Sequence, residues 1–238
     1  LAAAFCSWRA KDFGIKKDDF LDMLLWGLPI GIICARIYYV IFYLSLYRDG
    51  QGKFQWSEAI AIWDGGLAIY GGVIGGILTC LVVCKHKKLP FLAMADLSVM
   101  GLFIGQIMGR WGNFVNQEAY GGACDLPWRM GLIVDGQLIT VHPTFLYESL
   151  WNLMGLCLLF FVVRRGRRFD GGLFLCYLGW YGLGRFWIEG LRTDSLYLFG
   201  TGIRVSQLVA LVSVLVAAAL LVRMRVFVKP DPQKMWVH

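Results

Sequence analysis

The sequence predicts an all-α, polytopic integral membrane protein: a helical bundle with six complete transmembrane helices and a truncated N-terminal one, seven in the full protein. Of its 238 residues 58% are hydrophobic and only 16% are charged, whereas soluble domains carry about 25% charged residues. The apolar residues also fall into runs of about 20, the length that crosses a bilayer as a helix. Because a backbone in lipid must satisfy its own hydrogen bonds, these runs are expected to be helices, and short alternating barrel strands do not fit them.

The first element is expected to be a fragment. Residues 1–8 read LAAAFCSW, which predicts the end of an apolar helix whose beginning precedes the sequence. Six complete spans follow, at roughly 21–46, 65–84, 91–114, 144–163, 172–190 and 203–222. Residues 1–238 are therefore expected to form a single transmembrane helical domain, with 115–143 as an extracytoplasmic loop segment rich in glycine and tryptophan.

The linkers between the spans alternate in charge. Lys and Arg gather in 9–19, 85–90, 164–170 and the tail from 223 onward, whereas the opposite linkers hold only Arg48, Lys53, Arg129 and Arg192. The positive-inside rule places the rich side in the cytoplasm, so the C-terminus is expected there and a restored N-terminus outside. The net charge of +7 is thus explained by membrane orientation, and no nucleic-acid partner is expected.

Polar residues from several spans are predicted to meet near the outer leaflet. A charge within a span costs about 2.5–3.5 kcal/mol on insertion scales, so it usually has a function; the alternatives are snorkelling to the interface or a structural ion pair. The predicted orientation places these residues in the outer halves of their spans: Arg36, Tyr70, Arg110, Asn113, His142, Tyr181, Arg185 and Glu189.

Spacing gives this cluster a chemical character. Tyr181, Arg185 and Glu189 are four residues apart and share one helix face, although Arg185 and Glu189 could simply neutralise each other. Arg110 and Asn113 are three apart and also face together. Two or three guanidiniums at headgroup depth suit a phosphate, because arginine offers a planar, bidentate set of donors. A phospholipid headgroup is the expected ligand.

One long motif carries a family resemblance. Residues 109–118 read GRWGNFVNQE, with Gly121 after them, which resembles the signature G-R-x-G-N-F-x-N-x-E-x-x-G of the prolipoprotein diacylglyceryl transferase family. Further stretches also resemble that family, in the same order along nearly the whole chain: Trp63-Asp64-Gly65-Gly66, Tyr70-Gly71-Gly72, Asp96, His142-Pro143-Thr144 with Tyr147-Glu148, and Tyr181-Gly182 through Arg185 and Glu189 to Arg192.

The resemblance implies a transferase of the bacterial cytoplasmic (inner) membrane that performs the first step of lipoprotein maturation. The sn-1,2-diacylglyceryl group of phosphatidylglycerol would pass to the lipobox cysteine thiol in the signal peptide of a prolipoprotein, forming a thioether and releasing glycerol-1-phosphate. It also implies a seven-helix topology with the N-terminus outside and the C-terminus inside, and the charge pattern independently indicates the same topology.

The resemblance also assigns roles to residues. Arg110 and Arg185 match phosphate-contacting arginines and are expected to bind the headgroup and stabilise charge on the leaving phosphate. Glu189 would hold Arg185. The expected catalytic residues are Arg110, Arg185, Tyr70 and Glu118. The expected substrate-binding residues are Arg110, Asn113, Asn116, Gly121, Arg185, Glu189, Tyr181, Arg36 and His142.

The residue at position 70 departs from the family pattern. Many members carry His-Gly-Gly where this chain has Tyr70-Gly71-Gly72, and that histidine has been viewed as the base that activates the thiol. A phenol, with an ordinary pKa near 10, is a poor base. Three possibilities remain open: Tyr70 acts as a phenolate near Arg110, the base lies elsewhere (His142 is a candidate), or the substrate phosphate accepts the proton.

Other functional classes fit less well. A membrane transporter or channel for an anionic lipid or solute is the main alternative, but the sequence has no repeated halves and no chain of carboxylates at mid-membrane depth. A purely structural membrane protein is the second. A metal or other cofactor is not expected, because the three histidines, at positions 86, 142 and 238, are scattered and form no ligand set.

Overall fold

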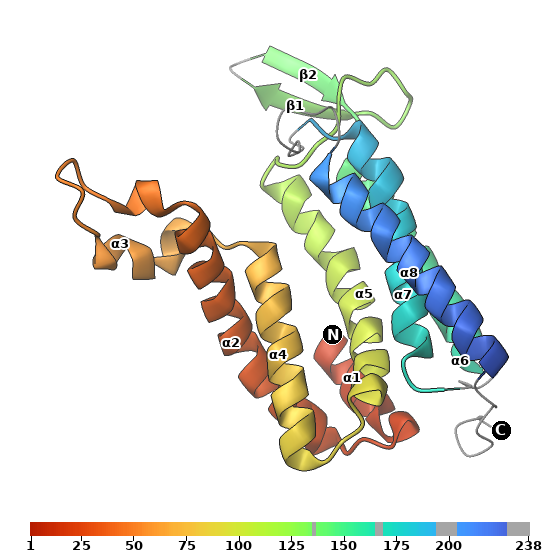
Figure 1. The fold of residues 1–238 in the computed structure, drawn as a ribbon. Coiled ribbons are helices and arrows are strands. Elements are labelled where there is room, and N and C mark those ends of the chain that lie inside the picture. The colour runs from red at the N-terminus through yellow and green to blue at the C-terminus, as the bar shows by residue number, and fades with distance from the viewer. Residues whose placement is uncertain (135–136, 165–168, 194–203, 228–238) are drawn as a thin grey trace. The chain divides into compact units, whose positions relative to one another are not determined.

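The structure, a computed structural model, describes residues 1–134, 137–164, 169–193 and 204–227. The chain divides into two compact units: an N-terminal unit of residues 6–94, and a C-terminal unit of residues 1–5 and 95–238 (Figure 1). The helices and strands are α1 (Ala2–Arg9), α2 (Lys17–Phe42), α3 (Trp56–Ile60), α4 (Ile69–Lys87), α5 (Phe91–Val115), β1 (Met130–Val134), β2 (Gln137–Val141), α6 (Thr144–Arg164), α7 (Gly172–Ile188) and α8 (Val205–Phe227). Short 3-10 turns cover Ala10–Phe13, Leu44–Tyr47, Ile62–Asp64 and Glu189–Leu191.

The predicted fold class is confirmed, because each apolar run corresponds to one long helix. Within the described residues, α2, α4, α5, α6 and α8 are long and apolar enough to cross a membrane. The sixth, α7, has 17 residues, at the short end of the lengths that span a bilayer. Large apolar side chains face outward, such as Leu25, Leu28 and Ile41 on α2 at 67%, 64% and 61% exposure. Such a surface suits lipid rather than water.

Part of the charge pattern used to predict topology lies outside the described residues. Residues 165–168 belong to the third positive segment, and Lys229 and Lys234 belong to the tail; the first residue of the last predicted span, 203, is also outside. Of the basic residues in these two segments the structure describes Arg164 at the end of α6, and Arg223 and Arg225 within α8.

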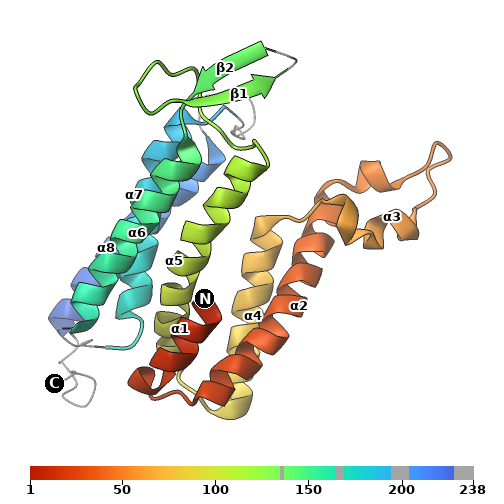
Figure 2. The same ribbon diagram turned by 180° about the vertical axis from the view of Figure 1, so that it is seen from behind.

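In the N-terminal unit, α2 and α4 lie side by side (Figures 1 and 2). Glycines permit this contact: a Cβ added to Gly75 would lie 2.7 Å from Cys34 Cβ, and one added to Gly71 would lie 2.6 Å from Tyr38 Cβ. The small-residue spacing in α4 thus serves close helix packing. At the other end of the pair, Lys87 forms ion pairs with two aspartates of α2, Asp19 and Asp22.

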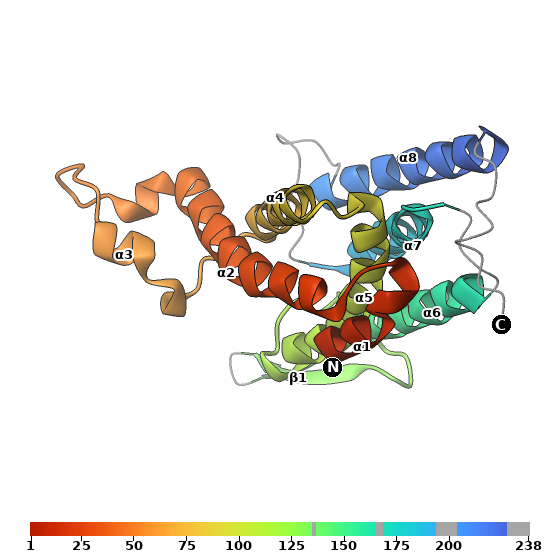
Figure 3. The same ribbon diagram turned by 90° about the horizontal axis from the view of Figure 1, so that it is seen from below.

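In the C-terminal unit, α7 packs between α6 and α8 (Figure 3). The helix α5 joins them through Tyr177 of α7, whose hydroxyl accepts a 2.8 Å hydrogen bond from Gln106 and whose ring meets Phe103 edge to face at 4.8 Å. Ser149 of α6 donates a 3.1 Å hydrogen bond to the carbonyl of Ile107 in α5. These contacts hold α5 against α6 and α7.

A buried carboxylate fixes the start of α7. Asp96 on α5 is fully buried and accepts 2.8 Å hydrogen bonds from the backbone N–H groups of Gly171 and Phe174. The first N–H groups of a helix have no partner within the helix, and a carboxylate there also interacts favourably with the helix dipole. Asp96 therefore caps a neighbouring helix and orients α7 against α5.

A pair of tryptophans joins α6 to α7. Trp151 and Trp180 stack with ring centroids 4.4 Å apart, and each indole N–H donates a 2.9 Å hydrogen bond to the other residue's carbonyl. Glycine is required beside them: a Cβ at Gly155 would lie 2.6 Å from Phe103 Cζ, and a Cβ at Gly184 would collide with the Trp151 indole. The stacked pair holds the two helices at a fixed separation.

We expect Gly184→Ala to destabilise the protein by about 1–3 kcal/mol, because the added methyl overlaps a ring that cannot move without breaking the stacked pair. The measurement is thermal unfolding in detergent. Gly179→Ala on the same helix is the control: its Cβ would make an ordinary 3.6 Å contact with Ala217, so the usual helix preference for alanine should leave it neutral or slightly stabilising. Equal melting temperatures for the two variants would contradict this interpretation.

The segment predicted as the 115–143 loop contains regular structure. Strands β1 and β2 pair antiparallel from Met130↔Val141 to Val134↔Gln137, and the hairpin lies at the end of the C-terminal unit where α5 ends and α6 begins (Figures 1 and 2). The side of β2 away from β1 also pairs with the loop, since the N–H of Cys124 donates to the carbonyl of Thr140 at 3.0 Å. The loop is thereby anchored close to the start of α6.

Candidate active site

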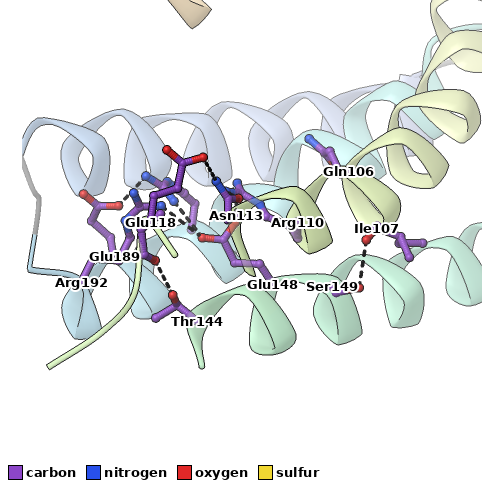
Figure 4. A network of polar contacts seen from close by, with 12 residues as sticks. Gln106, Ile107, Arg110, Asn113, Glu118, Thr144, Glu148, Ser149, Glu189 and Arg192 are labelled. Atoms are coloured by element: carbon purple, nitrogen blue, oxygen red, sulfur yellow. Dashed lines mark hydrogen bonds and ion pairs between the residues drawn. The ribbon is translucent and has the colours of Figure 1, made fainter. Parts of the chain in front are cut away.

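Charged side chains from three helix ends meet in the C-terminal unit (Figure 4). Arg110 lies in the last turns of α5, Glu148 near the start of α6, and Arg185 in the last turn of α7. Glu189 and Arg192 follow within and just after the turn that ends α7. Because α5 and α7 end where α6 begins, residues far apart in the sequence reach the same place.

Glu148 is the centre of this cluster. One carboxylate oxygen forms an ion pair with Arg110 Nη2, and the other lies 2.9 Å from Arg185 Nη1 and 3.7 Å from Arg192 Nη1. Its side chain is only 6% exposed. A buried carboxylate is costly unless ion pairs and hydrogen bonds compensate it, so Glu148 and the arginines hold one another in place.

Glu189 provides a second buried carboxylate. Its Oε2 lies 2.6 Å from Arg185 Nη2, four residues earlier on the chain, although the two atoms are not aligned as a hydrogen bond. Its backbone carbonyl accepts a hydrogen bond from Arg204. Arg185 is therefore fixed from two sides, by Glu148 on α6 and by Glu189 at the end of its own helix.

The cluster has a positive balance and remains accessible. Among the described side chains at the centre of the cluster, three guanidiniums (Arg110, Arg185 and Arg192) face two buried carboxylates (Glu148 and Glu189), an excess of one positive charge. The side chains of Arg110 and Arg185 are each 20% exposed. Guanidinium donors directed from two helices toward one region, with an excess positive charge, form a site suited to a phosphate or another compact anion.

A second polar network extends the site from Arg110 to Glu118. Arg110 Nη1 lies 3.4 Å from Asn113 Oδ1, at the long limit of a hydrogen bond, and the amides of Asn113 and Asn116 donate to Glu118 Oε1 at 3.0 and 3.2 Å. Glu118 stands in a tight turn between two residues with positive φ, Gln117 at 53° and Ala119 at 57°. Such a conformation costs about 1–2 kcal/mol per residue for non-glycine residues.

Gly121 allows the loop to pass close to the start of α6. Its N–H donates a 3.0 Å hydrogen bond to the carbonyl of His142, and it pairs as an isolated bridge with Arg192. A Cβ on Gly121 would lie 2.7 Å from His142 Cβ and 3.0 Å from the carbonyl oxygen of Leu191. Only glycine fits here, and the contact joins the loop, His142 and the segment that carries Arg192.

Tyr181 lies beside the charge cluster. With Glu148, Arg185 and Asn152 it lines a small hollow between α6 and α7, whose other lining residues are Trp151, Gly184 and Ile188. The ring of Tyr181 stacks on that of Tyr177 at 5.7 Å. The structure thus brings together the predicted residues Arg110, Asn113, Asn116, Glu118, Gly121, His142, Tyr181, Arg185 and Glu189 at one end of the C-terminal unit.

The other two predicted residues, Arg36 and Tyr70, belong to the N-terminal unit. Tyr70 is 44% exposed, with its ring 6.3 Å from that of Tyr38. Arg36 is buried, and its guanidinium donates to four backbone carbonyls: Ala59 at 2.9 Å, Glu58 at 2.6 Å, Gly65 at 2.6 Å and Gly66 at 3.0 Å. In this structure Arg36 serves to organise the loop between α3 and α4.

Arg36→Lys is expected to loosen residues 58–66, because an ammonium has neither the five donors nor the planar fork that reach four carbonyls. Hydrogen–deuterium exchange of this loop should become faster. Arg48→Lys, an exposed residue of the same unit, is the control. Unchanged exchange in the Arg36 variant would show that the loop does not depend on the guanidinium.

Sequence reasoning gave no role to Glu148 and Arg192, although both lie in stretches that carry the family resemblance. A signal was present for Glu148: it is an ionisable residue inside an apolar span, and such residues mark functional sites by default. The sequence did not reveal the partners of Glu148, because Arg110 and Arg185 are 38 and 37 positions away from it.

Comparison with known proteins gives a consistent result. Residues 1–223 match the sequence model of the family described as prolipoprotein diacylglyceryl transferase. Similar proteins named phosphatidylglycerol–prolipoprotein diacylglyceryl transferase occur in Lysinibacillus sphaericus (44% identity over 91% of this chain and 81% of the relative), Lactobacillus delbrueckii subsp. bulgaricus (46%, 97% and 84%) and Clostridioides difficile (46%, 87% and 79%).

Proposed function

The chain belongs to the prolipoprotein diacylglyceryl transferase family, and from this premise we propose that its charge cluster binds phosphatidylglycerol for transfer to a lipobox cysteine. It is a multi-pass membrane enzyme, a diacylglyceryl transferase of lipoprotein maturation, with phosphatidylglycerol and a prolipoprotein as substrates. The alternative of a membrane transporter or channel has no support from the family or from the names of the relatives.

The observation that supports this site is the shared carboxylate. Arg110 and Arg185 stand on different helices and both bind Glu148, so their guanidiniums are held close together before any ligand arrives. A site whose donors are already oriented loses little free energy on reorganisation when charge develops. The same two arginines are those that the family resemblance assigns to the phosphate.

The reaction then divides between the substrates and this site. The thiolate sulfur of the lipobox cysteine attacks the glycerol carbon of the diacylglyceryl group. A carbon–sulfur bond forms, the carbon–oxygen bond to the phosphate breaks, and the electron pair leaves on glycerol-1-phosphate. Arg110 and Arg185 would stabilise the second negative charge that the phosphate gains. Asn113, Asn116 and Glu118 would hold Arg110 and the loop beside it.

We infer the orientation in the membrane from the charge pattern and the identity of the membrane from the family resemblance. The positive-inside rule places the C-terminus in the cytoplasm and the ends of α5 and α7 toward the outer leaflet. The enzyme would act in the bacterial cytoplasmic membrane as a single transmembrane domain and meet the signal peptide of its substrate at the outer surface. Neither a metal, a cofactor nor a nucleic acid takes part in the proposed reaction.

The test uses purified protein in detergent, a lipobox peptide and phosphatidylglycerol, with a chelator present. A thioether-linked diacylglyceryl peptide and free glycerol-1-phosphate should both appear. A peptide with serine in place of the lipobox cysteine should give no thioether product, and phosphatidylcholine, whose headgroup has no net charge, should be a poor donor. Folded protein that forms no product with phosphatidylglycerol would refute the proposal, and flux of an anionic solute through liposomes without product would favour a transporter.

A further inference from the structure

Three side chains beside the charge cluster form a hydrogen-bonded chain. Trp128 Nε1 lies 2.9 Å from Tyr147 Oη, and Tyr147 Oη lies 3.3 Å from His142 Nδ1. An indole N–H only donates, so the Tyr147 oxygen accepts from Trp128 and its own proton is available for His142 Nδ1. When Tyr147 donates to His142, Nδ1 is the acceptor and the proton of a neutral imidazole is on Nε2.

The surrounding backbone holds this chain in place. His142 exchanges two 3.0 Å hydrogen bonds with the 121–122 loop, donating its N–H to Gly122 and accepting from Gly121. The ring of Tyr147 faces that of Trp187 on α7 at 6.4 Å. Tyr147 and His142 are partly exposed and Trp128 is 55% exposed. The three hydrogen-bonded side chains are therefore held in place by the backbone on one side and accessible to another molecule on the other.

Two connections, one covalent and one through non-covalent contacts, link these three side chains to the charge cluster. Tyr147 directly precedes Glu148, the carboxylate that holds Arg110 and Arg185. On the other side, His142 contacts Gly121, which pairs with Arg192, and Arg192 Nη1 lies 3.7 Å from Glu148. A substrate whose phosphate is bound by the arginines would thus have a phenol and an imidazole at the border of its site.

We propose that Tyr147 and His142 form the proton relay that deprotonates the lipobox thiol, with Trp128 as the residue that positions Tyr147; this rests on the proposed function. The thiol proton passes to Tyr147 Oη while the Tyr147 proton passes to His142 Nδ1. The sulfur then attacks the glycerol carbon, the bond from that carbon to the phosphate oxygen breaks, and the imidazolium returns its proton to water or to the departing phosphate.

The chemistry of position 70 makes such a relay useful. Position 70 of this chain is a tyrosine, and a phenol with an ordinary pKa near 10 accepts a proton far less readily near neutral pH than an imidazole with an ordinary pKa near 6.5. The relay couples a phenol to an imidazole, so the phenol never has to carry the negative charge alone. The indole N–H of Trp128 donates to the same oxygen and favours that charge while the protons move.

Turnover of phosphatidylglycerol and a lipobox peptide, measured first with the unaltered protein, separates the two proposals. Absence of product there refutes the proposed function itself. If product forms, the turnover of His142→Gln and of Tyr147→Phe is compared with that of the unaltered protein. Tyr120→Phe is the matched control, because Tyr120 contacts Thr193 through its carbonyl and not through its hydroxyl. General-base catalysis contributes about 10²–10⁴-fold.

For His142→Gln we expect kcat to fall by about 10²-fold or more, with the KM for phosphatidylglycerol nearly unchanged. Free imidazole in the buffer should restore part of the activity of His142→Ala, which a structural role would not allow. If the histidine variants lose their thermal unfolding transition, the activity of Tyr147→Phe tests the relay instead. A folded Tyr147→Phe variant as active as Tyr120→Phe, or folded His142→Ala that imidazole does not rescue, would overturn the relay.

Discussion

Replacing Glu148 with glutamine is expected to reduce turnover by about 10²-fold or more, an effect comparable to removing a donor that stabilises the transition state. The carboxylate contacts Arg110, Arg185 and Arg192, and a neutral amide of the same shape accepts through one oxygen only. Two guanidiniums now held by opposite edges of one carboxylate would lose their common partner and repel each other.

The same variant should also be less stable. Removing one partner of a buried ion pair costs about 3–5 kcal/mol, because the other charge stays buried and uncompensated. Some of this cost should be recovered here, since the arginines are partly exposed and an anionic lipid can supply the missing charge. We therefore expect the melting temperature of Glu148→Gln to fall in neutral detergent and to rise again when phosphatidylglycerol is added.

Kinetic constants distinguish positioning from simple binding. Loss of Glu148 raises the positive charge of the cluster by one, so the KM for phosphatidylglycerol should not increase while kcat falls. Asp18→Asn, which neutralises an exposed carboxylate in the first turn of α2, is the control for charge alone. A Glu148→Gln variant with normal kcat would show that the arginines need no common anchor.

The apolar runs predicted the helices well because hydrophobic length is a local property. The errors at the helix ends have local causes too. The predicted span 21–46 is observed as Lys17–Phe42, because the first turn of α2 contains Asp18 and Asp19, favourable at a helix N-terminus but invisible to a search for apolar residues. The apolar residues after Phe42 continue as a 3-10 turn at Leu44–Tyr47.

The start of α4 shows the opposite error. An apolar run was predicted from residue 65, but the helix begins at Ile69. Gly65 and Gly66 have φ of 86° and 74°, a left-handed conformation outside the helix, and their carbonyls accept from Arg36. The depth of Arg36 in its span suggested a ligand-binding charge, whereas in the structure it donates to backbone oxygens of α3 and of the turn before α4. Spacing along α2 does not reveal these partners.

The sequence patterns named candidate site residues one by one but did not predict how they are arranged. The motif around Arg110 and the spacing of Tyr181, Arg185 and Glu189 located the polar residues of α5 and α7. The two arginines are linked through Glu148 of α6, which lies in a run that otherwise has the pattern of an apolar span. Which carboxylate meets which arginine depends on how the helix ends pack, and no local pattern encodes that.

Lysine in place of either arginine should be nearly as damaging as loss of Glu148, although the positive charge is kept. Arg110→Lys and Arg185→Lys are each expected to lower kcat/KM by about 10²–10³-fold. An ammonium is a single compact charge without a planar fork, so it cannot bind the carboxylate of Glu148 and the phosphate of the lipid at the same time. For Arg185 the loss includes the contact with Glu189, 2.6 Å from its second Nη.

The two variants should differ in one respect, which tests the geometry rather than the charge. Arg185 is held by Glu148 and Glu189. Its lysine variant leaves the Glu189 carboxylate, which is 2% exposed, without the guanidinium that contacts it, so this variant should also melt at a lower temperature. Arg110 is held by Glu148 and, more weakly, by Asn113 at 3.4 Å, so its lysine variant should lose activity with a smaller change in stability. Arg48→Lys, exposed and outside the cluster, should match the unaltered protein in both measurements. If both cluster variants kept their turnover, positive charge alone would suffice, and the bidentate recognition of phosphate that the structure suggests would have to be abandoned.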